Sequence, residues 1–198
     1  MKLTLIRHPR TLAEEGLCYG RTDVPVAAEL TREVAERVAP ALPRDVSMAC
    51  SPLVRCSGLA AAITELRPDL RARPDPRLAE MDLGQWEEGM WSAIERSAFD
   101  AWMRDFADTR AGVDGESTRQ FMQRVGAAFD DWKAGGRDAI WVTHAGVIRA
   151  VRLLHAGLRS VERSDQWPAE PIAFGEVVVF DVAEGQGASP QGAGVLGL

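Results

Sequence analysis

Apolar residues along the chain occur in short β-forming runs that alternate with longer stretches of helical spacing. The short runs predict five strands, at residues 3–7, 46–50, 71–73, 139–143 and 177–182. Between the strands, apolar residues three and four positions apart predict helices that cover both faces of a sheet. Alternation of strand and helix is typical of a parallel sheet. The pattern therefore predicts an α/β protein, a three-layer α/β/α sandwich with a mostly parallel central sheet.

Three of the predicted helices carry start signals. Thr31 is the expected cap of a helix whose apolar positions recur every four residues. Ser51 is followed by Pro52, which is the usual order of a cap residue and a first helical proline. Ser117 and Gln120 have the spacing of a capping box, which opens the third helix.

The chain of 198 residues suits one domain with a substantial core. We assign residues 1–184 to this domain and expect the Gly-rich stretch 185–198 to be a flexible tail. The net charge of −6 gives no reason to expect nucleic acid or a membrane as a partner. Attraction for an anionic substrate then has to come from a local cluster of arginines.

Cysteine usage favours a reducing compartment. The three cysteines, Cys18, Cys50 and Cys56, are an odd number without the spacing of a metal site. The chain enters a strand within three residues and shows no signal-peptide region. We therefore expect a cytoplasmic protein with no metal and no cofactor, because the three histidines are also dispersed. A tryptophan-rich helical stretch at 91–106 could cover an apolar interface in a homodimer.

Side chains suited to phosphate chemistry follow three of the predicted strands. Arg7 and His8 end the first strand, Arg55 lies in the first turn of the helix after the second, and His144 follows the fourth. Parallel strands bring their carboxyl ends to one edge, so these residues can converge. Two guanidiniums can hold the non-bridging oxygens of a phosphoryl group. A neutral imidazole at the phosphorus can act as nucleophile and form a phosphohistidine.

A leaving alkoxide needs a proton, so the site requires a carboxylic acid. Glu80 is the candidate because it begins a Gly-containing loop after the third strand, and Asp82 and Glu87 are close rivals. The alternatives are purely structural: His8 would cap a loop and His144 would cap a helix. An arginine such as Arg55 in the first turn of a helix favours a bound anion, since that turn normally prefers acidic residues.

The long loop 10–28 is the expected site of substrate selection. Loops of this length in compact domains are usually functional or disordered, and its buried-type residues favour function. Thr11, Tyr19, Gly20 and Arg21 are the candidate substrate-binding residues on the leaving-group side, with plain loop packing as the alternative. The stretch 91–106 is the second element that can shape this side, as core or lid packing.

Several motifs resemble the histidine phosphatase superfamily, whose fold is phosphoglycerate mutase-like. In chain order they are Arg7-His8-Pro9-Arg10-Thr11, Ser51-Pro52-Leu53-Val54-Arg55, Glu80 with Gly84-Gln85-Trp86-Glu87, Gly115-Glu116-Ser117 and Thr143-His144-Ala145-Gly146. The resemblance implies a phosphohistidine at His8, a phosphate pocket completed by Arg7, Arg55 and His144, and Glu80 as proton donor. Within the superfamily, the segment Leu17–Pro25 resembles the α-ribazole phosphatase branch, which acts in cobalamin assembly.

Two residues depart from the family pattern. Pro9 replaces the usual glycine after the nucleophile, which removes an N–H but leaves the side chain of His8 untouched, so we expect activity to survive. Glu88 stands where the family tends to have the glycine of Trp-Glu-Gly, which makes the loop near Glu80 harder to predict.

The first functional hypothesis is a metal-independent phosphomonoester hydrolase whose small-molecule substrate is α-ribazole 5′-phosphate. The alternatives are a phosphoglycerate mutase or a broad-specificity sugar-phosphate phosphatase, and a non-catalytic phosphate-binding module prompted by Pro9. A mutase has to hold its intermediate and exclude water, which usually demands extra lid segments. The short chain between Glu80 and His144 therefore favours hydrolysis.

Overall fold

A six-stranded sheet forms the centre of the computed structural model, which describes residues 1–182 and 194–195. The strands are Lys2–Arg7 (β1), Ser47–Cys50 (β2), Ala72–Pro74 (β3), Ala139–Thr143 (β4), Val177–Asp181 (β5) and Gly194–Val195 (β6). They lie in the order β3-β2-β4-β1-β5-β6. Strands β1 to β4 run parallel, while β5 is antiparallel to β1. The predicted mostly parallel sheet is confirmed.

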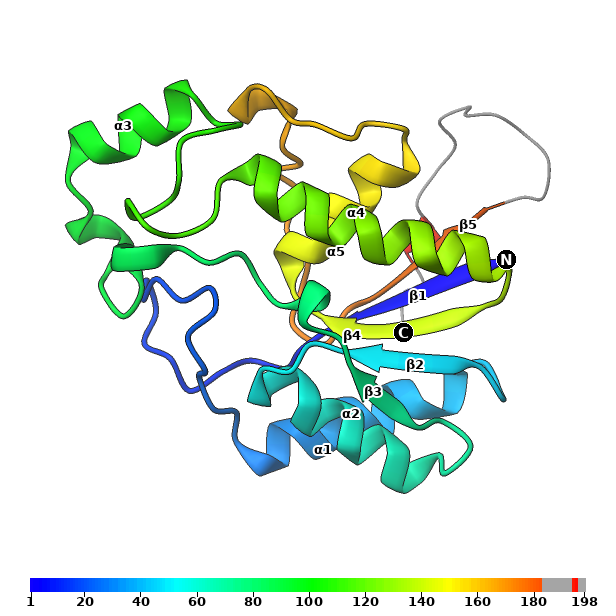
Figure 1. Cartoon of the computed structure of the whole chain (residues 1–198). Helices are drawn as coiled ribbons and strands as arrows, with labels where there is room; N and C mark the ends of the chain where they lie inside the picture. Colours follow the sequence, from blue (N-terminus) through cyan, green and yellow to red (C-terminus); the bar gives the residue numbers. More distant parts are fainter. Residues whose placement is uncertain (183–193, 196–198) are drawn as a thin grey trace.

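Helices cover both faces of the sheet. Helices Ala28–Val38 (α1) and Val54–Leu66 (α2) lie on one face, and Thr118–Gly135 (α4) and Ala145–His155 (α5) lie on the other (Figure 1). Strand β4 is buried along its whole length, and its side chains alternate between the two faces. Trp141 belongs to the core under α4 and α5, whereas Ile140 and Val142 belong to the core under α1 and α2.

Two of the predicted helix starts are wrong. Helix α1 begins three residues before Thr31, whose hydroxyl bonds back to the Ala27 carbonyl at 3.3 Å. Helix α2 begins at Val54, three residues after Ser51, because the Val54 amide is capped by the Asp23 carboxylate at 2.7 Å. The predicted capping box at the start of α4 is confirmed, with Ser117 as the cap.

The predicted helical stretch 91–106 is divided. A single 3₁₀ turn, Trp91–Ala93, precedes the helix Arg96–Arg104 (α3), whose start is capped by Glu95. None of the residues of α3 is fully buried, although its half-buried Trp102 stands edge-on to Trp86 with ring centroids 5.6 Å apart. Helix α3 lies apart from the sheet, at one end of the molecule (Figure 1).

The predicted tail, residues 185–198, falls outside the described residues except for Gly194–Val195. That pair forms β6 and extends the sheet antiparallel to β5, which the weak patterning of the tail does not predict. Among the described residues, no helix combines the length and the apolar character needed to cross a bilayer.

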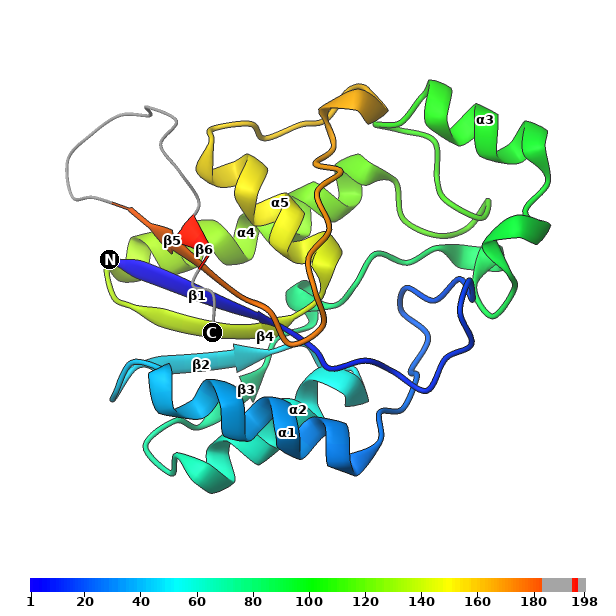
Figure 2. The same ribbon diagram turned by 180° about the vertical axis from the view of Figure 1, so that it is seen from behind.

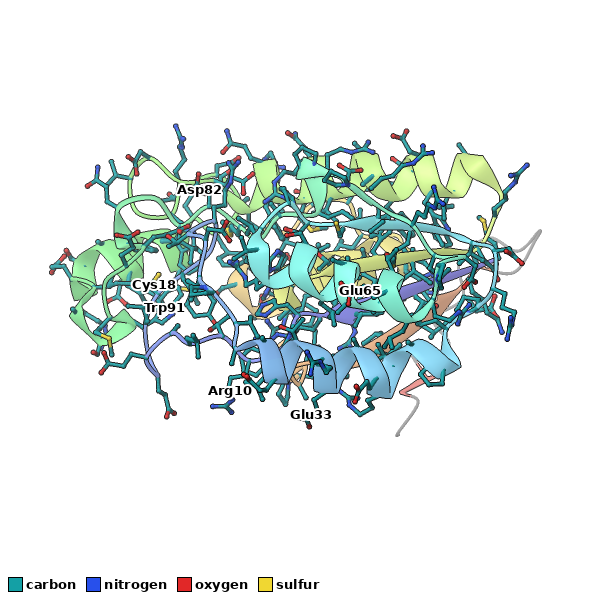
Figure 3. The ribbon with its side chains drawn as sticks, turned by 90° about the horizontal axis from the view of Figure 1, so that it is seen from below. Arg10, Cys18, Glu33, Glu65, Asp82 and Trp91 are labelled. Carbon is teal, nitrogen blue, oxygen red and sulfur yellow. The ribbon has the colours of Figure 1, made fainter. Side chains whose placement is uncertain are left out.

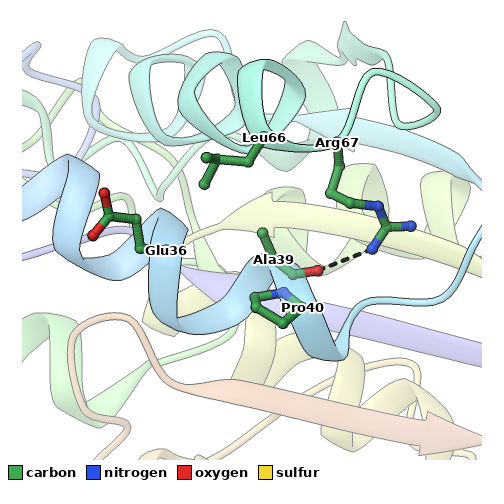
Figure 4. Close-up of a pocket in the computed structure, with 5 residues that line it drawn as sticks. All are labelled: Glu36, Ala39, Pro40, Leu66 and Arg67. Carbon is green, nitrogen blue, oxygen red and sulfur yellow. Dashed lines mark hydrogen bonds between the residues drawn. The ribbon is translucent and has the colours of Figure 1, made fainter.

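A surface pocket of about 270 Å³ lies between α1 and α2 (Figure 4). It is lined by Glu36, Ala39, Pro40, Leu66 and Arg67. The Arg67 guanidinium is already occupied there, because it donates to the Ala39 carbonyl at 2.9 Å and pairs with Asp69 at 2.7 Å. Its role is to close the end of α1, and the pocket is remote from the strand ends.

Candidate active site

The carboxyl ends of three adjacent strands, β1, β4 and β2, bring the predicted residues together. Backbone pairing continues past the strands: the amide of His8 donates to the Thr143 carbonyl and that of Ser51 to the Val142 carbonyl, each at 3.0 Å. The rings of His8 and His144 consequently meet edge-on with centroids 5.2 Å apart. The predicted convergence of the two imidazoles at one sheet edge is present.

His8 is held in one tautomer. Its Nδ1 lies 2.7 Å from the carbonyl oxygen of Pro9, and because a carbonyl only accepts, Nδ1 carries the proton. The lone pair is then on Nε2. Burial, with help from the nearby Arg55 charge, lowers the pKa of His8 to about 3. The side chain is therefore a neutral imidazole with a free Nε2, the form that a nucleophile requires.

Pro9 accepts the hydrogen bond that fixes the tautomer of His8. Proline removes an N–H but retains its carbonyl, and the carbonyl is the group that orients the imidazole. The replacement of the family's usual glycine therefore leaves the tautomer of His8 fixed.

His144 is fully buried at the N-cap position of α5, yet its side chain makes no capping bond. Its Nδ1 accepts from Arg55 Nε at 3.3 Å, so its Nε2 carries the proton and donates to the Ser51 hydroxyl at 2.8 Å. Burial and the Arg55 charge hold the pKa of His144 well below its usual range. Ser51, which the sequence pattern marked only as a helix cap, instead orients this imidazole.

Arg55 is 1% exposed and connects the sheet edge to the loop 10–27. Its terminal nitrogens donate to the carbonyls of Gly20 at 2.5 Å and Thr22 at 2.8 Å. With Nε on His144, three of its five N–H groups have partners among the described residues. One N–H on each terminal nitrogen is left for an anion.

Arg7 carries an unpaired donor inside the site. Its Nη1 donates to the Ile172 carbonyl, while its buried Nε has no acceptor in the described part of the chain. Burial lowers the pKa of Arg7, and the Glu80 carboxylate opposes that shift. The guanidinium carbon stacks 3.9 Å from the ring centroid of Phe174, which also lies 5.6 Å from the His8 ring. A bound oxyanion would satisfy the orphaned donor.

The Glu80 carboxylate reaches the start of α5, two residues from His144. Its Oε2 accepts from the Gly146 amide and its Oε1 from the Met81 amide, each at 3.1 Å. A β-carbon at Gly146 would collide with Oε1, so glycine is needed for this approach. Each oxygen keeps a further lone pair that can hold a proton.

The two rival carboxylates are occupied elsewhere. Glu87 Oε1 accepts from the amides of Arg21 and Leu83 at 2.8 Å, and although burial opposes it, hydrogen bonding lowers the pKa of Glu87. Asp82 accepts from the Gly84 amide at 2.9 Å and faces Arg21 at 3.5 Å. The geometry therefore favours Glu80 over Asp82 and Glu87 as proton donor.

Of the four candidate substrate-binding residues, three are linked to Arg55 directly or through one another, and Arg21 is not. Thr11 donates to the Tyr19 hydroxyl at 3.2 Å, and the Tyr19 ring lies 5.4 Å from the Arg55 guanidinium carbon. Gly20 gives its carbonyl to Arg55, and a β-carbon there would strike the Met81 carbonyl. Arg21 is half-exposed and its side chain is directed to Asp82, so the structure does not bring it to the two site arginines.

Loop 10–27 lies beside segment 84–91 and pairs with it through an antiparallel bridge between Leu17 and Met90 (Figure 2). Cys18 donates its amide to Gly89 at 2.7 Å and accepts from the Glu88 amide at 2.8 Å. Glu88 has φ 67°, a left-handed backbone that glycine adopts more readily. The loop thus keeps the conformation suited to the family's glycine. Cys18, Asp82 and Trp91 lie at this end of the molecule (Figure 3).

Phe174 and Ser51 are the contacts that sequence reasoning missed at the site itself. Phe174 lies in a loop without periodic pattern, so only its position before β5, the antiparallel neighbour of β1, could have pointed to it. In the described ranges, no group of three His, Cys, Asp or Glu residues could hold a metal ion.

The chain is similar to known proteins both at the level of a family and at the level of solved structures. The family model "Histidine phosphatase superfamily (branch 1)" matches residues 3–188. A search of curated proteins returned no match. Among solved structures, the chain is similar to TTHB049 from Thermus thermophilus, with 29% identity, a TM-score of 0.67, and coverage of 91% of this chain and 94% of that one.

Two further structures are similar over nearly their whole length. A phosphoglycerate mutase from Thermus thermophilus is 30% identical, with a TM-score of 0.66 and coverage of 91% of this chain and 93% of that one. The α-ribazole phosphatase from Shigella flexneri is 24% identical, with a TM-score of 0.77 and coverage of 93% and 92%. The latter likeness shows a shared fold.

Proposed function

The chain belongs to the histidine phosphatase superfamily, and from this premise we propose that it hydrolyses phosphate monoesters through a phosphohistidine at His8, without a metal ion. The observation that carries the proposal is the bond from His8 Nδ1 to the Pro9 carbonyl. It leaves the Nε2 lone pair free beside two arginines that retain unpaired N–H groups. Positioning and charge stabilisation are the main requirements of phosphoryl transfer.

In the first step, His8 Nε2 attacks the phosphorus, the N–P bond forms and the P–O bond to the alcohol breaks. Arg7 and Arg55 hold the equatorial oxygens, and Glu80 gives its proton to the leaving alkoxide. In the second step, water attacks the phosphorus and gives its proton to Glu80, and the N–P bond breaks. The lone pair returns to Nε2, and ester plus water have become alcohol plus inorganic phosphate.

The proposed substrate is α-ribazole 5′-phosphate, on the resemblance of Leu17–Pro25 to that branch. Tyr19 within this segment places an aromatic ring beside the phosphate pocket, where a flat base can stack. A cytoplasmic location and a small-molecule partner follow as parts of the same proposal.

Substrate choice is tested by comparing kcat/KM over a panel of phosphate esters that includes α-ribazole 5′-phosphate. We expect a clear preference for this ester. A flat profile would remove the substrate assignment and leave hydrolysis in place.

The phosphohistidine is tested with His8→Ala, and His155→Ala is the matched control because His155 packs against Phe180, away from the site. We expect His8→Ala to abolish turnover and trapping of an acid-labile, alkali-stable phosphoenzyme. Retained turnover in His8→Ala would overturn the proposal.

Phosphoglycerate mutase activity is the second candidate, supported by the 30% identity to the Thermus enzyme. Measuring phosphoryl transfer between 2- and 3-phosphoglycerate against release of free phosphate separates mutase from hydrolase. A broad sugar-phosphate phosphatase would release free phosphate from many different esters at similar rates. Binding of vanadate without any turnover would instead indicate a phosphate-binding module.

A further inference from the structure

Arg124 makes an unusually complete set of contacts beside the site. It lies on α4, and all five of its N–H groups have acceptors. Nη1 donates to the carbonyls of Arg77 and Ala79 at 2.8 and 2.7 Å, and Nη2 donates to the Glu80 carbonyl at 2.8 Å. The remaining donors, on Nε and Nη2, reach the Glu116 carboxylate at 2.6 and 2.7 Å.

Glu116 extends the same set of bonds beyond Glu80. Its Oε2 accepts from the Asp82 amide at 3.0 Å. The Arg124 and Glu116 side chains are only 20% and 15% exposed. Although burial opposes it, the bonds from Arg124 lower the pKa of Glu116, so the carboxylate stays charged. The pair therefore fixes the backbone on both sides of Glu80.

From this arrangement we propose that Arg124 and Glu116 are positioning residues for Glu80, the proton donor of the proposed function on which this inference rests. The Glu80 carboxylate is held by two backbone amides, but its reach is set by where segment 77–82 lies against α5. Arg124 and Glu116 bind that segment at three carbonyls and one amide. A displacement of about 1 Å at a catalytic group can lower a rate about 100-fold.

The test uses two esters that differ in their need for a proton. An activated nitrophenyl phosphate releases its phenolate unaided, whereas a primary alkyl phosphate releases an alkoxide that Glu80 has to protonate. Lysine cannot reproduce the five-donor fork of Arg124. We expect Arg124→Lys to lower kcat/KM, which reports the first step and not the hydrolysis shared by both esters, about 100-fold on the alkyl ester and less than about 5-fold on the nitrophenyl ester.

Arg119→Lys is the matched control. Arg119 lies on the same helix and is also paired twice, with Asp108 at 2.6 Å and Glu162 at 3.1 Å, but it contacts neither segment 77–82 nor the site. We expect it to leave kcat/KM on both esters unchanged. The double variant Arg124→Lys/Glu80→Gln should be no slower on the alkyl ester than Glu80→Gln alone, because both changes remove the same proton transfer.

Equal losses on the two esters, or losses that add in the double variant, would overturn the inference. If Arg124→Lys does not fold, Glu116→Gln is compared on the same two esters. This variant weakens the ion pair with Arg124 and can keep one bond to the Asp82 amide. Its rate on the alkyl ester must again fall by a larger factor than its rate on the nitrophenyl ester. Retained turnover in His8→Ala would defeat the proposed function, whereas inactive His8→Ala with no ester difference in Arg124→Lys would defeat this inference alone.

Discussion

Acidification should destabilise the protein through His8. The pKa of this imidazole is about 3 in the folded protein, against 6.5 as the ordinary value for histidine. Between these two values the unfolded chain binds a proton that the folded protein excludes. Stability contributed by the neutral imidazole is therefore complete above pH 6.5 and falls as the pH falls toward 3.

The expected loss follows from the difference between the two pKa values. Each pH unit below 6.5 costs about 1.4 kcal/mol, so His8 alone costs about 2 kcal/mol of unfolding free energy at pH 5. That is a large share of the roughly 5–15 kcal/mol by which a typical domain is stable. The depressed pKa of His144 acts in the same direction, so the protein as a whole should lose more.

His8→Asn isolates the contribution of His8, because the asparagine amide nitrogen can replace Nδ1 as donor to Pro9 and does not titrate. Urea unfolding of both proteins at pH 7 and pH 5 measures the effect. The buffers should be free of phosphate, since a bound anion would stabilise the folded state by mass action. Wild type should lose about 2 kcal/mol more than the variant between the two pH values. Equal losses would refute a neutral, buried His8.

Three further substitutions, and one control, test the site and the loops. Gly146→Ala should lower kcat on an alkyl phosphate at least about 10-fold, because the added methyl meets the Glu80 carboxylate, whereas Gly58→Ala, whose methyl meets nothing, should keep kcat and add about 0.5–1 kcal/mol of stability in urea. Glu88→Gly should raise the unfolding free energy by about 1 kcal/mol, as the left-handed φ of 67° strains any residue with a β-carbon; a lower urea midpoint would contradict this. Arg55→Lys should lower kcat/KM on any ester about 100-fold or more, since the bonds to His144 and the loop carbonyls are lost together; an unchanged inhibition constant for inorganic phosphate would argue against its role in the pocket.

The strands could be predicted because their signal is local and strong. Strand β4, whose five residues are all buried, matches its apolar run residue for residue. Helix starts depended on tertiary partners and were less predictable. Ser51 precedes a proline as a cap residue would, but its hydroxyl bonds to His144 and the Asp23 carboxylate caps the helix instead. Local pattern is overridden there by residues more than 30 positions away.

The candidate site was predictable where residues follow strand ends. His8 and His144 follow parallel strands, so the sequence predicted one shared edge, and they meet because β1 and β4 are neighbours in the strand order. Arg124 lies in the middle of a helix and acts on carbonyls more than 40 residues earlier. No periodicity in the sequence reports such a contact. Arg21 was predicted to share the role of Tyr19, two residues before it, but its side chain pairs with Asp82 instead.

Helix α3 contributes two half-buried aromatic side chains, Phe99 and Trp102, but no fully buried residue. Most of the buried core belongs to the sheet and the four helices packed on it, so substitutions at the exposed positions of Arg96–Arg104 should remove little of it, whereas Trp102 and Met103 pack against it. The groups proposed to make and break the P–O bond, His8, Arg55 and His144 among them, are buried at the edge of the sheet. Exposed positions of α3 can therefore change over evolutionary time without moving the proposed reacting groups, so under the proposed function the leaving-group side can diverge faster than the phosphoryl chemistry.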